Sequence, residues 1–299
     1  SLPNTLQSIM DQVFKDCENL SSLVGFEKTQ LTVLGNQALY NTSITELHFP
    51  KTITSIDASY FNFSGITVKR LIFEKYGSIT NGEFKNLKSL EYIEFKEFNV
   101  NSIIQYGGQL RDSTNLKTVI LGEGLTSIGN SAFAGCSTLN SVKLPNSLTL
   151  IDSSAFASCL ALTNVQFGAG LETIASLSFS ESGLSELTLP NSVRTIEAGA
   201  FMNCTKLSKI VLNEGLQTIN GDAFSGCTNL SYIVIPKSVT TVCNFYGSKI
   251  NVFAELYKEE ASTLEGWSDL LGVVGDDTQN VNLYYADEWS YVNGIPTKN

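Results

Sequence analysis

The sequence predicts an α/β repeat solenoid, with a parallel β-sheet on one face and short helical turns on the other. A bulky apolar residue, usually Phe, returns ten times along the chain at steps of 22 to 26 residues. A short alternating apolar segment and a Pro or Gly recur at the same interval. A fixed period near 23 residues indicates one short structural unit stacked on the next. The recurring positions are Phe14, Leu39, Phe61, Phe84, Leu110, Phe133, Phe156, Phe179, Phe201 and Phe224.

The first part of each repeat is a predicted strand. In Val142-Lys-Leu144 the two apolar side chains share one face, because side chains alternate along a strand. Pro145 then ends the strand. The first apolar members of these strands are Leu23, Leu47, Leu71, Ile93, Val119, Val142, Val165, Leu187, Ile210 and Ile233.

The second part of each repeat is a predicted helical or 3₁₀ turn. Residues 132–139 read Ala-Phe-Ala-Gly-Cys-Ser-Thr-Leu, and their apolar side chains are spaced by three. Neither part can bury its apolar side alone. Stacked coils can, with a continuous core between the sheet and the turns.

Two motifs recur with this period. Leu-Pro-Asn-Ser-Leu/Val stands at 144–148 and 189–193, and Ala-Phe-x-x-Cys stands at 132–136, 155–159 and 223–227. In these motifs the chain resembles the BspA-like, Treponema-type leucine-rich repeat family over residues 2 to about 242. The resemblance implies a leucine-rich-repeat solenoid and a secreted or cell-surface bacterial protein. It also implies adhesion to matrix proteins or other bacteria, as in some members, and it offers no catalytic residues to carry over.

We expect the solenoid over residues 1–242 and a capping segment over 243–299. In the latter, residues 250–253 and 280–286 read as strands, 255–271 as a helix broken at Gly266-Trp267, and 289–296 as a turn or hairpin. A solenoid end exposes its core and needs a cap. The alternative is an aromatic platform for carbohydrate. The large side chains available for either role are Trp267, Tyr284, Tyr285, Trp289 and Tyr291.

One step of the series is longer than the others. Phe84 and Leu110 lie 26 residues apart, which predicts an insertion near Asn99–Gly108. Insertions in solenoids map to loops that often carry specificity. Degeneration of the repeat is the other explanation, because Leu110 also departs from the Phe of the template.

Composition and charge exclude several classes of function. The chain carries 29 acidic and 19 basic residues, a net charge of −10, and no run of Lys or Arg. We therefore expect no nucleic-acid partner and no anionic membrane surface as a partner. No stretch of about 18 consecutive apolar residues is present, so we expect no membrane insertion. The chain opens on Ser1-Leu-Pro-Asn-Thr-Leu6, in the middle of the repeat template, so we expect a processed protein whose targeting segment is gone.

Five cysteines sit three residues after the recurring apolar position, where we expect side chains to face inward. We interpret them as free, buried thiols, since stacked side chains rarely present the dihedral angle of a disulfide. Cys243 breaks this pattern, and we expect it to be more exposed. The five are Cys17, Cys136, Cys159, Cys204 and Cys227.

The sequence contains no catalytic or metal-binding pattern. A single histidine, His48, excludes most histidine-based triads and multi-histidine metal sites, and CxxC is absent. The acidic pairs Glu259-Glu260 and Asp276-Asp277 lie in a polar tail and read as solvated charge. We expect no enzyme activity, no metal and no cofactor.

The remaining candidate is the outward face of the sheet. The residues flanking each inward apolar position form two rows, and two clusters in these rows combine Tyr, Arg or Lys with aliphatic side chains, as protein contact sites do. Strand propensity alone also favours such residues. The candidate binding residues are Arg70, Ile72, Tyr92 and Ile120 in one cluster, and Lys209, Val211, Tyr232 and Val234 in the other.

We therefore expect a non-catalytic, monomeric binding protein. Its partner would be an extracellular or host protein, such as a matrix glycoprotein or another cell surface. Two alternatives stay open: a stiff spacer that presents another domain, and a carbohydrate-binding accessory module in the tail.

Overall fold

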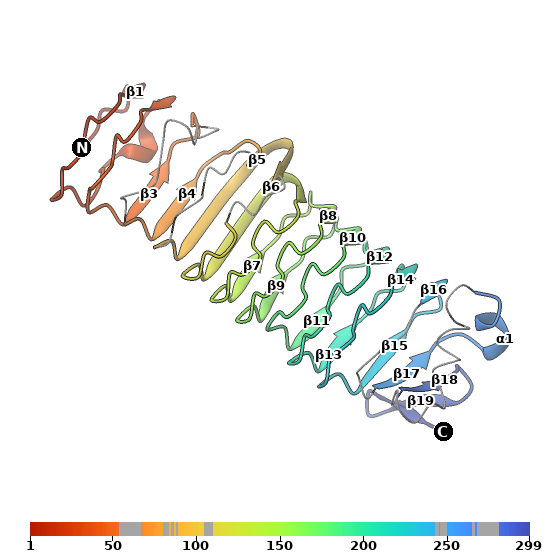
Figure 1. Cartoon of the computed structure of the whole chain (residues 1–299). Coiled ribbons are helices and arrows are strands. Elements are labelled where there is room, and N and C mark those ends of the chain that lie inside the picture. Colours follow the sequence, from red (N-terminus) through yellow and green to blue (C-terminus); the bar gives the residue numbers. More distant parts are fainter. Residues whose placement is uncertain are drawn as a thin grey trace.

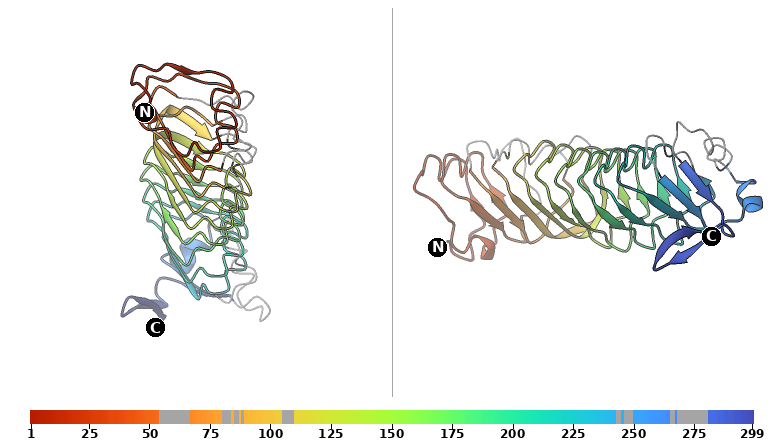
Figure 2. Two further views of the ribbon diagram at one scale, coloured as in Figure 1. Left: turned by 90° about the vertical axis from the view of Figure 1, so that its left-hand side faces the viewer. Right: turned by 90° about the horizontal axis from the view of Figure 1, so that it is seen from below.

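The computed structural model is an elongated stack of coils, with the two termini at opposite ends (Figure 1). It describes residues 1–53, 67–79, 84, 87, 89–104, 110–242, 245, 250–264, 267 and 281–299. Successive coils lie side by side along the long axis (Figure 2). The fold is a parallel β-solenoid with a period of about 23 residues, as the sequence predicts.

The predicted strands form the broader of the two faces. Inward-facing Leu47, Leu71, Ile93 and Val119 lie in register on four neighbouring strands, because each repeat offers the same alternating pattern to its neighbour. Leu23 lies outside any strand. The strands of this face are β3 (Glu46–Phe49), β4 (Arg70–Phe73), β5 (Tyr92–Ile104), β6 (Thr118–Ile128), β7 (Ser141–Lys143), β9 (Asn164–Gln166), β11 (Glu186–Thr188), β13 (Lys209–Val211), β15 (Tyr232–Ile235), β17 (Ile250–Ala254) and β18 (Val281–Tyr284).

A second face of short parallel strands was not predicted. Ile151, Ile174 and Ile196 are in register and fully buried, while Thr173 and Thr195 lie on the opposite side. Two-residue strands are too short to show an alternating period in sequence. The strands are β1 (Ser8–Ile9), β2 (Val33–Leu34), β8 (Leu150–Ile151), β10 (Thr173–Ile174), β12 (Thr195–Ile196), β14 (Thr218–Ile219) and β16 (Thr241–Val242).

The predicted helical turns are wrong for the Ala-Phe-x-Gly-Cys segments, which are consecutive β-turns. In the coil of Phe133, φ is positive at Ser131 and Gly135, two residues before and two after the Phe. The coils of Phe156, Phe179, Phe201 and Phe224 repeat both offsets. Left-handed residues at every fourth position are incompatible with a helix.

The backbone N–H groups of these turns donate alternately within the turn and to the next coil. The N–H of Ala134 closes a turn on the carbonyl of Ser131 at 3.2 Å, whereas the N–H of Phe133 donates to Ala155 of the next coil at 2.8 Å. The five N–H groups from Ala132 to Cys136 each find a partner in this way, as burial requires. The turns therefore connect the coils as the strands do.

The predicted insertion lies inside β5. Glu97 pairs with Glu123 of β6, and the next pair is Ser102 with Leu125. β5 thus uses five residues where β6 uses two, and β6 then has one extra residue between Leu125 and Ser127, so two of the three residues by which the 26-residue step exceeds 23 lie within β5. This part of the insertion is a bulge in the strand. Positions 105–109 of the predicted loop lie outside the described residues.

One apolar core runs along the axis and includes a stack of phenyl rings. Phe133, Phe156, Phe179, Phe201 and Phe224 follow one another with centroids 5.1–5.6 Å apart and rings within 9° of parallel. Stacks of this kind add about 0.5–1.5 kcal/mol per pair to the area that they bury.

Four of the predicted core cysteines are buried beside this stack: Cys136, Cys159, Cys204 and Cys227. Each thiol donates to a carbonyl of the preceding coil, such as Cys159 to Phe133 at 3.3 Å. Cys17 is exposed, contrary to the prediction. Cys17 lies in the outermost coil of the described stack, which packs against a neighbouring coil on one side. Cys243 lies outside the described residues.

The C-terminal segment contributes to both the core and the sheet. The predicted strands are β17 and β18, and the predicted hairpin is β19 (Trp289–Val292) with β20 (Ile295–Lys298). Within the predicted 255–271 helix, the structure contains α1 (Lys258–Ala261). The 3₁₀ helix η1 (Phe26–Lys28) lies near the N-terminal end of the chain. Trp267 is fully buried, as a cap requires. Trp289 instead packs on the outer side of the sheet, 5.4 Å from Phe253.

Candidate functional site

The outward rows exist as the sequence predicts. One row continues in register from Glu46 through Arg70, Tyr92 and Thr118, and the other from His48 through Ile72, Glu94 and Ile120. Ile72 is an exception to the predicted exposure, because its side chain is buried. Its register partners on the neighbouring strands are His48 and Glu94.

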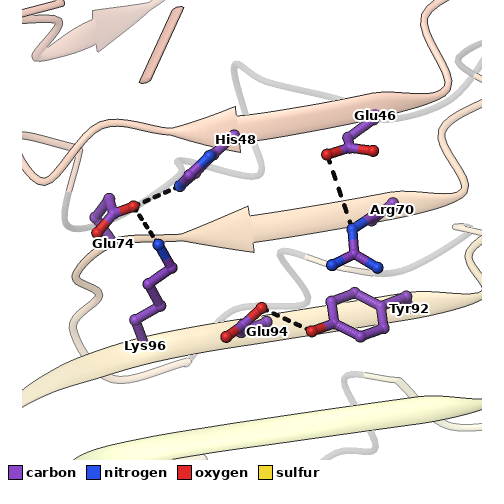
Figure 3. Close-up of polar contacts among 7 residues, drawn as sticks. All are labelled: Glu46, His48, Arg70, Glu74, Tyr92, Glu94 and Lys96. Atoms are coloured by element: carbon purple, nitrogen blue, oxygen red, sulfur yellow. Dashed lines mark hydrogen bonds and ion pairs between the residues drawn. The ribbon is translucent and has the colours of Figure 1, made fainter. Parts of the chain in front are cut away.

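Side chains of the N-terminal cluster are engaged in contacts with other side chains of the same sheet face. The Arg70 guanidinium lies over the Tyr92 ring at 3.6 Å and 3.8 Å from a Glu46 carboxylate oxygen. The Tyr92 hydroxyl donates to Glu94 at 2.7 Å. Burial, followed by this hydrogen bond, raises the pKa of Tyr92. Arg70 and Tyr92 therefore bind each other across neighbouring strands (Figure 3).

A second charged group lies beside it on the same face. Lys96 donates to Glu74 at 2.6 Å, and His48 contacts the same carboxylate oxygen (Figure 3). The hydrogen bond from Lys96, and then the contact with His48, hold the pKa of Glu74 below its usual value against the opposing effect of burial. Ile120, the remaining predicted residue of this cluster, lines a separate cavity of about 480 Å³ together with Glu94 and Lys143.

The C-terminal cluster lines a pocket. Lys209 and Val211 of β13, with Tyr232 and Val234 of β15, contribute to a cavity of about 360 Å³. All four predicted residues of this cluster thus meet at one place. Val211 is 43% exposed, which is unusual for a large apolar side chain in the described part of this chain.

The opposite wall of the pocket is the β19–β20 hairpin. Tyr291 and Pro296 are register partners and line the cavity together with Gly294. The hairpin is held against the sheet by Trp289, whose indole N–H donates to the Ala254 carbonyl at 2.9 Å. Asn293 and Gly294 both have positive φ, as the two-residue hairpin turn requires.

Two carboxylates complete the pocket. Glu214 follows β13 and Glu255 follows β17, so both lie at the edge where these parallel strands end. Burial, and then the proximity of Glu214, raise the pKa of Glu255. Burial and the charge of Glu255 likewise raise the pKa of Tyr291. Among the described residues, no Lys or Arg lies within ion-pair distance of either glutamate.

Sequence reasoning missed Glu214, Glu255, Tyr291 and Pro296 as site residues. Glu214 follows Leu212 by two residues, as Glu123 follows Leu121 in an earlier repeat. The period could therefore have placed Glu214 on this edge of the sheet. The position of the hairpin has no such signal, because it lies outside the repeats.

Other chemistry finds no support in the described ranges. No three His, Cys, Asp or Glu side chains gather there in a way that could hold a metal ion. In the same part of the chain, no helix has the length and apolarity that crossing a bilayer requires.

Stacked parallel strands of period 23, with an extended outward face, define a leucine-rich-repeat solenoid of the kind that binds other macromolecules. The chain belongs to the BspA type leucine rich repeat family. Copies of the model of that family, described as "BspA type Leucine rich repeat region", match residues 1–107, 108–182 and 126–251.

Solved structures of leucine-rich repeat proteins resemble the chain. The Treponema pallidum protein TpLRR is 28% identical, with 50% of this chain and 76% of that chain covered and a TM-score of 0.45. A protein from Eubacterium ventriosum is 27% identical, covering 82% and 75%, with a TM-score of 0.44. A leucine rich cell surface protein from Faecalibacterium prausnitzii is 18% identical, covering 95% and 86%, with a TM-score of 0.33. No curated protein matches the sequence.

Proposed function

We propose that this chain is a non-catalytic interaction module of a secreted or surface-displayed bacterial protein, and that it binds a partner protein through the C-terminal part of its outward sheet face. The observation that carries the proposal is the pocket formed by Lys209, Val211, Tyr232 and Val234 with the β19–β20 hairpin. Membership of a family of interaction repeats supports the same class of function.

The two predicted clusters differ in the contacts that their side chains already make, and this difference favours a binding site at the C-terminal end of the sheet. Arg70 and Tyr92 are already engaged with each other and with Glu46 and Glu94. Binding a partner there would first break these contacts. The C-terminal pocket is instead preformed, so a partner loses little free energy to reordering the site.

Binding of the purified chain to a panel of matrix glycoproteins and glycans at physiological salt tests the proposal. The variant Val211→Ser/Tyr232→Ala removes pocket-lining surface, and Gln166→Ala/Thr188→Ala is a matched control on the same face, outside the pocket. We expect saturable binding that the first variant weakens at least about tenfold, or about 1.4 kcal/mol, and the control leaves unchanged. Binding unaffected by the pocket variant would place the site elsewhere.

The glycan arm of the panel tests a carbohydrate-binding function in the tail. Tyr291 is 58% exposed and packs edge-on against Trp289 with centroids 5.2 Å apart, as an aromatic platform would. Glycan binding lost in Tyr291→Ala, with no protein of the panel bound, would favour that function over the first.

A further inference from the structure

We propose that the pocket between β13, β15 and the β19–β20 hairpin binds a lysine or arginine side chain presented by an extended segment of the partner protein. The inference rests on the proposed function, because it assigns the group that the C-terminal sheet face recognises. The shape, the lining and the charge of the pocket each contribute to it.

The size of the pocket suits one long side chain and its flanking backbone. Its volume of about 360 Å³ lies near the lower end of the range of about 300–1,000 Å³ that is typical of ligand pockets. Its two walls, the sheet and the hairpin, are both β-structure, and the cavity is open to solvent between them. An extended segment can therefore lie along the sheet and place one side chain between the walls.

The lining is suited to the stem of such a side chain. Val211, Val234 and Pro296 supply aliphatic surface, and Tyr232 and Tyr291 supply aromatic surface. Lysine and arginine bury their methylene groups against such surfaces and keep the charged end at polar groups. An ammonium or guanidinium also gains about 0.5–2 kcal/mol over an aromatic face.

The charge of the pocket selects a cation. Two carboxylates, Glu214 and Glu255, stand against one ammonium, Lys209, which leaves a net lining charge of −1. Lys209 is in register with Glu186 of β11, so a carboxylate neighbours it on the side away from β15. Within the described residues neither glutamate forms an ion pair, and the nearby charge of Lys237, with a hydrogen bond from its backbone, offsets only part of the effects that raise the pKa of Glu255. A bound cation would remove their mutual repulsion, whereas an anionic ligand would increase it.

Selection of peptides by the full chain tests this inference. A phage-displayed library of random hexapeptides is panned on the protein, and the enriched peptides are synthesised with each lysine or arginine kept or replaced by norleucine. Each peptide is titrated against the unmodified chain, Glu214→Gln/Glu255→Gln, and the control Glu172→Gln/Glu259→Gln. The control makes the same change in net charge at exposed glutamates outside the pocket.

We expect enriched peptides to share a lysine or arginine. The pocket variant should weaken their binding about tenfold while the control changes it less than about twofold. The norleucine peptide should lose the same affinity for the unmodified chain and no further affinity for the pocket variant, because the two changes remove one interaction. Thermal unfolding of each variant confirms that the fold is retained.

Three outcomes overturn the inference. They are enriched peptides without a basic residue in common, equal losses in the pocket variant and the control, and no enriched peptide at all. Suppose that the enriched peptides share no basic residue and bind the unmodified chain but not Val211→Ser/Tyr232→Ala. The proposed function then stands, and only the basic anchor is rejected. Failure of that function is recognised separately, by binding in the glycoprotein panel that survives Val211→Ser/Tyr232→Ala.

Discussion

At the scale of single residues, Glu123 within β6 and Glu255 just after β17 show how two carboxylates differ in their surroundings. Glu123 accepts hydrogen bonds from the backbone N–H groups of Asn146 and Ser147, both at 3.0 Å, and these hold its pKa below the usual value. Glu255 is more buried and lies near Glu214, and its pKa is raised. The first carboxylate is stabilised in its charged form by the next coil, whereas burial and Glu214 make the charged form of the second unfavourable, and a hydrogen bond from the Lys237 backbone offsets only part of this.

The two residues predict opposite pH dependences of stability. A lowered pKa in the folded state gives stability that is present above the unfolded value of about 4.5 and is lost as the pH falls through the folded pKa. Glu123→Gln should therefore lower the free energy of unfolding at pH 7 by about 0.5–1 kcal/mol, with the difference disappearing in acid. Urea titrations at pH 3, 5 and 7 measure this effect.

For Glu255 the sign is reversed. A raised folded pKa gives stability that is present below the unfolded pKa and is lost as the pH rises through the folded value. Glu255→Gln should therefore be at least as stable as the unmodified chain at pH 7, and this advantage should shrink in acid. A clear loss of stability at pH 7 would show that Glu255 has a structural partner and is not a residue kept for binding.

The cysteines predict a pattern of chemical reactivity. Burial raises the pKa of the Cys136 thiol to about 12 and that of Cys159 well above its usual value, whereas Cys17 is exposed. Only the thiolate reacts readily, so Ellman's reagent should modify Cys17 in the native protein and leave the buried Cys136, Cys159, Cys204 and Cys227 unmodified until urea is added. A hydrogen bond with Cys227 lowers the pKa of Cys204, so burial alone protects that thiol from the reagent. Peptide mapping by mass spectrometry identifies each site. Rapid native labelling of Cys159 would contradict its placement in the core.

At the scale of elements, close contact between coils depends on Gly122 in the middle of β6. A Cβ atom there would lie 2.1 Å from the backbone carbonyl oxygen of Lys96, which a side-chain rotation cannot relieve. Gly122→Ala should therefore cost about 2 kcal/mol or more, because β5 and β6 must move apart. Gly294→Ala is the matched control: its φ of 78° is strained for alanine, but nothing lies within 4 Å, so about 1 kcal/mol is expected. Equal losses in urea denaturation would contradict the steric argument.

The elements also show what sequence can establish. The strand positions follow from alternation alone, and the register of Leu47, Leu71, Ile93 and Val119 follows from the 23-residue period. The turns could not be predicted correctly, since a spacing of three apolar residues is shared by helical turns and by β-turns with left-handed residues. Ser154 and Leu177 take positive φ although neither residue type favours it. Stacking on the next coil imposes this conformation, and no local pattern records it.

The candidate site divides in the same way. Lys209, Val211, Tyr232 and Val234 were found because the period places them on one face. Sequence could not show that Arg70 and Tyr92 satisfy each other, which depends on side-chain orientation across strands. Nor could it show that the hairpin folds over the outer face of the sheet, because Trp289 reaches Ala254 across 35 residues.

At the scale of the whole molecule, the aromatic stack changes sides along the axis. The N-terminal coils stack Phe49, Phe73 and Phe95 from the strand side, with centroids 4.5 and 5.0 Å apart. From Phe133 onward the stack is built from the turn side. Each coil still contacts mainly its neighbours, so stability should be a sum of local terms and not one property of a single core.

Substitution in the second stack tests this view. Phe179 is fully buried, and its ring stacks on Phe156 at 5.3 Å and on Phe201 at 5.6 Å. Phe179→Ala should cost about 3–5 kcal/mol through lost burial and a cavity. Leu160→Ala, at a side chain 55% exposed, should cost less than about 0.5 kcal/mol.

The distribution of that loss along the axis decides between a one-dimensional and a globular description. Native-state hydrogen exchange of Phe179→Ala should show reduced protection in β9 to β14, next to the cavity, and unchanged protection in β3 and β4. The reason is that coils several repeats away share no contact with the altered ring. An equal fall in protection from β3 to β17 would mean that the solenoid unfolds as one unit. The preformed pocket at its C-terminal end would then be coupled to the most distant coils.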